Sequence, residues 1–96
     1  MKQVHITSSV GDVDLPTVTV SKSGSEEVTW HSHANKPAQI RFDSPDGSPF
    51  QKATFDVPAG GSISSGPSLS HVAHKSYKYT VVGPDGENDP VVIVDN

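Results

Sequence analysis

The sequence predicts an all-β protein, an antiparallel Greek-key β-sandwich of seven to eight strands in a single domain over residues 1–96. Three observations lead to this fold class. Glycine and proline occur 8 times each, so turns are frequent. Only 32% of the residues are hydrophobic, and they fall in short segments at alternate positions, which is typical of half-buried strands. Several short strands separated by closely spaced turns are the pattern of a sandwich or barrel.

The first half of the chain contains four predicted strands. They cover residues 2–8, 16–20, 26–32 and 38–42. Val4 and Ile6 alternate with polar residues in the first strand, and Val28 and Trp30 share one face of the third. Ala34-Asn-Lys-Pro37 separates the third strand from the fourth, because proline cannot continue a paired strand.

The second half contains four more predicted strands. They cover residues 53–57, 62–65, 76–82 and 91–94. The segment 76–82 is the strongest strand signal, since it is rich in aromatic and β-branched residues. Pro-Asp-Gly occurs at 45–47 and again at 84–86, where proline presets φ and glycine accepts a positive φ. We therefore expect residues 83–90 to form a turn.

Four segments in this order carry a family likeness. They are Val28-Thr-Trp30 followed by Asn35, Pro37 and Phe42; Phe55-Asp-Val-Pro-Ala-Gly-Gly-Ser62; Tyr77-Lys-Tyr-Thr-Val81; and Val91–Val94. Over residues 16–95 the chain resembles the cupredoxins, the plastocyanin- and azurin-like copper domains. The resemblance implies a cupredoxin-like β-sandwich.

The resemblance also implies that the type-1 copper ligands are missing. The first ligand histidine of that family would fall at Ala38, and the ligand cysteine at or near Val81. The second histidine and the methionine would follow within residues 83–90, which contain neither. The chain has no cysteine, and a blue-copper centre requires a thiolate and two imidazoles. We expect no type-1 copper and no other bound cofactor.

Histidines offer a different metal site. His31 and His33 are two residues apart, so on one strand they would face the same way, roughly 6–7 Å apart along the backbone. His71 and His74 are three apart, so one helical turn would place them on one side. If both pairs met, four imidazoles would suit copper or zinc. Exposed histidines without a metal are the alternative interpretation.

Other partner and reaction classes find little support. A net charge of −4 argues against nucleic acid and anionic membranes as partners. No apolar segment is long enough to span a membrane, and no signal peptide is recognisable, so an extracytoplasmic location would require that a leader had been removed. No catalytic residue can be named, because no nucleophile, base and orienting group have a recognisable spacing.

The leading functional prediction is therefore not an enzyme. It is a non-catalytic cupredoxin-like binding or interaction module without type-1 copper, with an unknown protein partner or none. The alternative is a copper or zinc transport or storage protein that uses His31, His33, His71 and His74. A small enzyme without a recognisable motif is a third, weaker interpretation. The sequence leaves the partner and the oligomeric state open.

Overall fold

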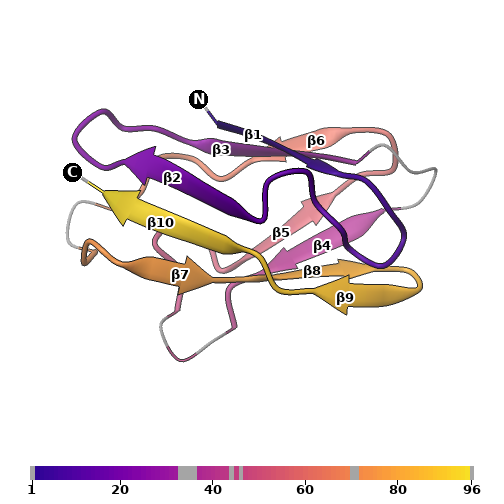
Figure 1. Ribbon diagram of the computed structural model, residues 1–96. Helices are drawn as coiled ribbons and strands as arrows, with labels where there is room; N and C mark the ends of the chain where they lie inside the picture. Colours follow the sequence, from indigo (N-terminus) through magenta and orange to yellow (C-terminus); the bar gives the residue numbers. More distant parts are fainter. Residues whose placement is uncertain (1, 33–36, 44, 46, 70–71, 96) are drawn as a thin grey trace.

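The computed structural model describes residues 2–32, 37–43, 45, 47–69 and 72–95. Ten strands form within these residues (Figure 1). They are β1 (Lys2–Ile6), β2 (Thr17–Ser21), β3 (Val28–Ser32), β4 (Ala38–Arg41), β5 (Thr54–Val57), β6 (Ser62–Ser64), β7 (Ser76–Lys78), β8 (Thr80–Gly83), β9 (Gly86–Asn88) and β10 (Val91–Asp95). The predicted all-β class is confirmed.

The strands pair into three small sheets that enclose one core. The strand orders are β1-β3-β6, β2-β10-β7 and β5-β4-β8-β9. Figure 1 shows β7 running directly into β8, with the sheet of β1, β3 and β6 lying apart from them. Only Tyr79 separates β7 from β8, so the second and third sheets are joined along one extended segment.

Two strand pairs run parallel, which corrects the expectation of a purely antiparallel sandwich. They are β1 with β3 and β10 with β2. The reason lies in the connections, because β2 belongs to a different sheet from β1 and β3. The chain leaves the first sheet after β1 and returns to it at β3, running in the same direction as before.

The segment 83–90 is more ordered than a turn. Gly86–Asn88 forms β9, which pairs with β8 in the register Val82↔Glu87. The Pro84–Asp85 corner is therefore the tip of a hairpin. The prediction of a turn over 83–90 was too wide, because the exposed and polar β9 has no buried face that a sequence pattern could reveal.

Aromatic side chains fill the centre of the sandwich. The ring centroid of Trp30 lies 5.3 Å from that of Phe55, 5.7 Å from Tyr79, 6.3 Å from Phe42 and 6.4 Å from Phe50. These distances are typical of edge-to-face and tilted pairs, each contributing about 0.5–1.5 kcal/mol beyond burial. Trp30, Phe42 and Phe55 are all buried in this core.

The strands alternate as the sequence pattern indicated. On β3, Val28 and Trp30 are buried, whereas Thr29 and His31, which alternate with them, are partly exposed on the other face. In the described part of the chain, no helix has the length and apolar character needed to cross a membrane.

Candidate functional site

The two positions that the resemblance predicts for the first copper ligands lie on neighbouring strands. Ala38 starts β4, and Val81 lies on β8 directly opposite Ile40. Ala38 is 8% exposed and Val81 is fully buried. Neither side chain has an atom that could bind a metal, so the residues present do not fit a type-1 copper ion. At these two positions, apolar packing takes the place of ligand chemistry.

An open depression lies beside these positions. Its volume is about 420 Å³, and its lining is Pro37, Ala38, Gln39, Asp56, Val82, Gly83 and Pro84. Most of these residues are apolar or lack a polar side chain. The depression therefore offers a small apolar floor at the surface, next to the buried core.

Polar side chains border the apolar floor. Gln39 pairs with Asp56 on β5 and with Val82 on β8, and Val82 pairs with Glu87 on β9. Gln39 Nε2 donates a 3.0 Å hydrogen bond to Asp56 Oδ1, and Arg41 Nε donates to Gln39 Oε1. A row of side chains across four strands thus carries a carboxylate at each end and valine near its middle.

Close backbone packing fixes the rim at Gly83. A Cβ added to Gly83 would lie only 2.1 Å from the carbonyl oxygen of Ser9, so no other residue fits without movement. The same carbonyl accepts a 3.0 Å hydrogen bond from Asp85 N. Gly11, with φ of +83°, allows the 8–11 loop to turn against β8. Val10 in this loop lies beside Gly86, where an added Cβ would come within 3.2 Å of its side chain, and is 41% exposed.

Tyr79, a buried residue of the core, is uncharged at neutral pH. Trp30 Nε1 donates a 3.2 Å hydrogen bond to Tyr79 Oη, inside the core. Burial raises the pKa of Tyr79 to about 12, because the tyrosinate would lose its hydration; the hydrogen bond from Trp30 lowers the pKa and the charge of Asp14 raises it. Tyr79 is therefore a structural residue that holds the orientation of Trp30.

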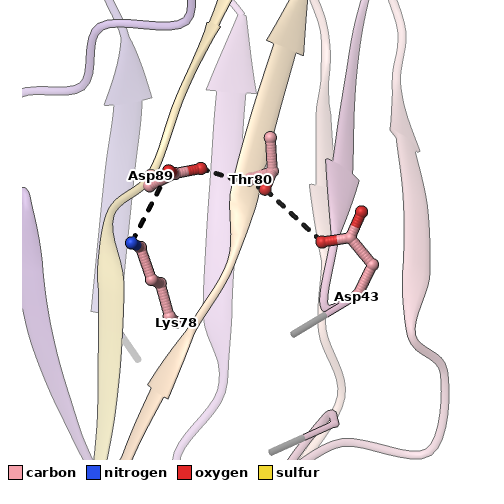
Figure 2. Close-up of polar contacts among 4 residues, drawn as sticks. All are labelled: Asp43, Lys78, Thr80 and Asp89. Carbon is pink, nitrogen blue, oxygen red and sulfur yellow. Dashed lines mark hydrogen bonds and ion pairs between the residues drawn. The ribbon is translucent and has the colours of Figure 1, made fainter. Parts of the chain in front are cut away.

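A second polar cluster lies at the start of β8 (Figure 2). Thr80 Oγ1 lies 3.1 Å from Asp89 Oδ1 and 3.5 Å from Asp43 Oδ1, and Lys78 Nζ lies 3.6 Å from Asp89 Oδ2. The hydroxyl has one proton, so it can donate to only one carboxylate at a time. The Lys78–Asp89 pair is more than half exposed and is worth little. These contacts join β8 to the residues that follow β4 and β9.

The four histidines of the predicted metal site are only partly placed. His33 and His71 lie outside the described residues. His31 lies on β3 in the first sheet, and His74 is an exposed residue before β7 in the second. Among the residues that the structure describes, no group of three or more histidine, aspartate or glutamate side chains could hold a metal ion.

The structure instead places His31 beside His5, which sequence reasoning left out of the predicted site. His5 and His31 are directly paired across the parallel strands β1 and β3. Their ring centroids are 4.7 Å apart and their planes differ by 15°, so the rings are stacked. Both residues alternate with buried apolar residues along their own strands. The sequence did not show that β1 and β3 are neighbours, and this register is the missing information.

Comparison with solved structures gives the fold its name. A purple cupredoxin from Nitrosopumilus maritimus is similar over 99% of this chain and 100% of its own, with a TM-score of 0.68 and 16% identity. A reduced proline-to-phenylalanine mutant of amicyanin is similar over 98% of this chain and 81% of its own, with a TM-score of 0.65 and 16% identity. No protein-family model matches the chain, and no curated protein matches it.

The likeness concerns the fold alone, because identity is low. The fold is cupredoxin-like, as the sequence predicted. A methionine-to-alanine amicyanin mutant described with Cu(I) is also similar, with a TM-score of 0.63, 17% identity and coverage of 98% of this chain and 81% of its own. The copper belongs to that protein, and the present chain has no cysteine.

Proposed function

We propose that the protein is a non-catalytic binding module that recognises a protein segment at the open depression beside β4 and β8. One observation carries the proposal. Where the fold's metal ligands would begin, this chain has buried or nearly buried apolar residues, Ala38 and Val81, beside an apolar surface. The scaffold is kept while the reactive groups are absent, and function depends on such local sites rather than on the fold.

The depression has the composition of a small recognition surface. Val82, Pro37 and Pro84 supply apolar area, while Gln39 and Asp56 supply polar groups at the border. An apolar centre with a polar rim is the usual anatomy of a protein interface. The hydrogen bonds from Arg41 to Gln39 and from Gln39 to Asp56 hold the rim before a partner binds, which lowers the entropic cost of association.

The charge of this surface favours one kind of partner. Asp56 and Glu87 stand at the two ends of the row that contains Val82, and the whole chain carries a net charge of −4. A segment that presents an apolar side chain flanked by lysine or arginine would complement this row. Such charge complementarity mainly increases the association rate and the specificity.

The test uses a random peptide library displayed on phage and selected against the immobilised full chain. We expect enriched peptides to combine an apolar residue with basic neighbours. In a titration with one such synthetic peptide, amide resonances of Gln39, Val82 and Gly83 should shift. Peptides without basic residues, or shifts confined to another face, would contradict the proposal.

Two variants sharpen this test. Val82→Asp places a charge on the apolar floor and should abolish peptide binding, whereas Thr19→Asp adds the same charge at an exposed position on β2 and should leave it intact. Asp56→Lys should weaken binding and reduce its salt dependence. Equal binding by the Val82→Asp and Thr19→Asp variants would exclude the depression as the contact surface.

Copper or zinc binding by histidines remains the second candidate function. The stacking of His31 on His5 favours it, since imidazoles suit both metals. The four-histidine version requires His31, His33, His71 and His74 to act together. It predicts sub-micromolar one-site binding that is lost in both His31→Ala and His71→Ala, as calorimetry would show; binding no tighter than that of a free histidine peptide would exclude it.

A further inference from the structure

We infer that His5 and His31 form a two-imidazole binding site for a divalent transition-metal ion such as Zn²⁺ or Cu²⁺ on the outer face of β1 and β3. The site shares only His31 with the four-histidine set predicted from the sequence. It lies on a different sheet from the depression, so it stands or fails independently of the proposed peptide-binding function.

The strand register brings the two rings together. His5 and His31 are directly opposite in parallel strands, and neighbouring strands are about 4.8 Å apart. The observed ring separation of 4.7 Å agrees with this spacing. In a metal site the ring nitrogens would have to converge from this stacked arrangement. Rotation of the His5 ring about its Cβ–Cγ bond achieves this at low cost while Gln3 holds the His31 ring, because that torsion of histidine is broad.

A hydrogen bond selects the nitrogen of His31 that can bind the metal. His31 Nε2 is bonded to Gln3 Oε1, and an amide oxygen can only accept. Nε2 therefore carries the proton, and the lone pair of the neutral ring is on Nδ1. A metal-binding histidine commonly donates its other N–H to such an oxygen, which fixes the tautomer and the orientation of the ring.

Asp14 holds the backbone of His5 through two hydrogen bonds. Asp14 Oδ1 accepts a 2.8 Å hydrogen bond from His5 N, and Asp14 N donates a 3.0 Å hydrogen bond to His5 O. This two-point contact fixes the edge strand at the site. The net charge of −4 also supports cation binding in general.

The experiment is a calorimetric titration of the chelator-free full chain with Zn²⁺. We expect one ion per chain. The His5→Ala and His31→Ala variants should each bind at least about tenfold more weakly, since even the loss of a hydrogen-bond partner behind a ligand costs about 10–100-fold. Thr29→Ala, on the same face of β3, and His74→Ala should bind as the wild type does.

The binding nitrogen gives a second and independent readout. Long-range ¹H–¹⁵N spectra of the imidazoles should show Zn²⁺ on Nδ1 of His31 with the proton kept on Nε2. Gln3→Leu should lower the affinity about tenfold, and Gln3→Glu should restore it. If a substitution at His5 unfolds the chain, as circular dichroism would show, His5→Gln replaces it.

Three results would overturn the inference. Equal Zn²⁺ affinity of His5→Ala and the wild type would remove His5 from the site. Loss of binding in His74→Ala but not in His5→Ala would assign the metal to the other histidines. Zn²⁺ on Nε2 of His31 would contradict the role of Gln3. None of these results bears on peptide binding at Val82.

Discussion

The depression beside β4 and β8 and the histidine pair on β1 and β3 are built in opposite ways. At the depression, Ala38, where the resemblance predicts a ligand histidine, is apolar, and the polar groups Gln39 and Asp56 are hydrogen-bonded to each other. On the histidine face, two groups able to bind metal lie together where the resemblance to cupredoxins gave no reason to expect a ligand. The two regions lie on different sheets of one scaffold, so each can be altered while the other is kept.

Both regions depend on the same core. Trp30 on β3 is fully buried and packs against aromatic residues from the rest of the sandwich, while the next residue, His31, faces outward. The inner face of a strand can therefore preserve the fold while the outer face changes its chemistry. The four predictions below test how far the two regions are independent, beginning with the largest effect.

Trp30→Ala should affect both regions together. Removal of the indole leaves a cavity among the aromatic residues, and we expect the free energy of unfolding to fall by about 3–5 kcal/mol. Urea denaturation followed by circular dichroism measures this loss. If the variant lost less than about 1 kcal/mol, the core would not be the shared support of the two regions. The same urea denaturation of Phe55→Ala would then show whether the result is particular to Trp30.

High pH should weaken the core through Tyr79. Its pKa is about 12 in the folded chain and about 10 when unfolded. Because the folded pKa is raised, the stabilisation is complete below pH 10 and is lost as the pH rises toward 12, by about 3 kcal/mol in total. Denaturation midpoints between pH 9 and 12 measure this.

Tyr79→Phe supplies the control for the pH prediction. It should remove the part of the alkaline loss that belongs to Tyr79 and cost about 1–3 kcal/mol at neutral pH, because Trp30 Nε1 loses its buried acceptor. A pH profile of Tyr79→Phe identical to that of the wild type would show that alkaline unfolding has another origin.

Gly83→Ala should disturb the depression and spare the histidine pair. The added Cβ meets the backbone of Ser9 rather than a movable side chain, so we expect a loss of about 1–3 kcal/mol and weaker peptide binding with unchanged Zn²⁺ affinity. Gly24→Ala is the control, since its Cβ would meet side-chain atoms rather than backbone, the nearest being Ser21 Oγ at 3.1 Å. A parallel loss of Zn²⁺ binding in Gly83→Ala would show that the two regions are coupled.

The sequence predicted the fold well because the relevant signals are local. Alternation identified the buried faces of β1 and β3, and Pro-Asp-Gly marked the turn whose tip is Pro84–Asp85. The polar β9 was missed because it buries no apolar face. The parallel pairing of β1 with β3 was also missed, since register between strands distant in the chain depends on the whole packing.

The candidate sites were predicted less completely for the same reason. Ala38 and Val81 could be named from the resemblance, and the structure places them on adjacent strands. The partnership of His31 with His5 spans 26 residues of sequence and depends on the parallel register, so spacing along one strand suggested His33 instead. Local spacing finds ligands within one element, whereas this pair is formed by two.

His31→Ala should have the smallest effect on stability and the clearest effect on binding. The side chain is partly exposed and packs outside the core, so we expect the free energy of unfolding to change by no more than about 0.5 kcal/mol. Zn²⁺ at one hundred times its dissociation constant should stabilise the wild type by about 2.7 kcal/mol, and at the same concentration should stabilise His31→Ala far less. Denaturation with and without Zn²⁺ measures both quantities. A loss above about 2 kcal/mol without metal would instead make the stacked pair a structural element of β1 and β3, because a ligand site on an outer face should be dispensable for folding.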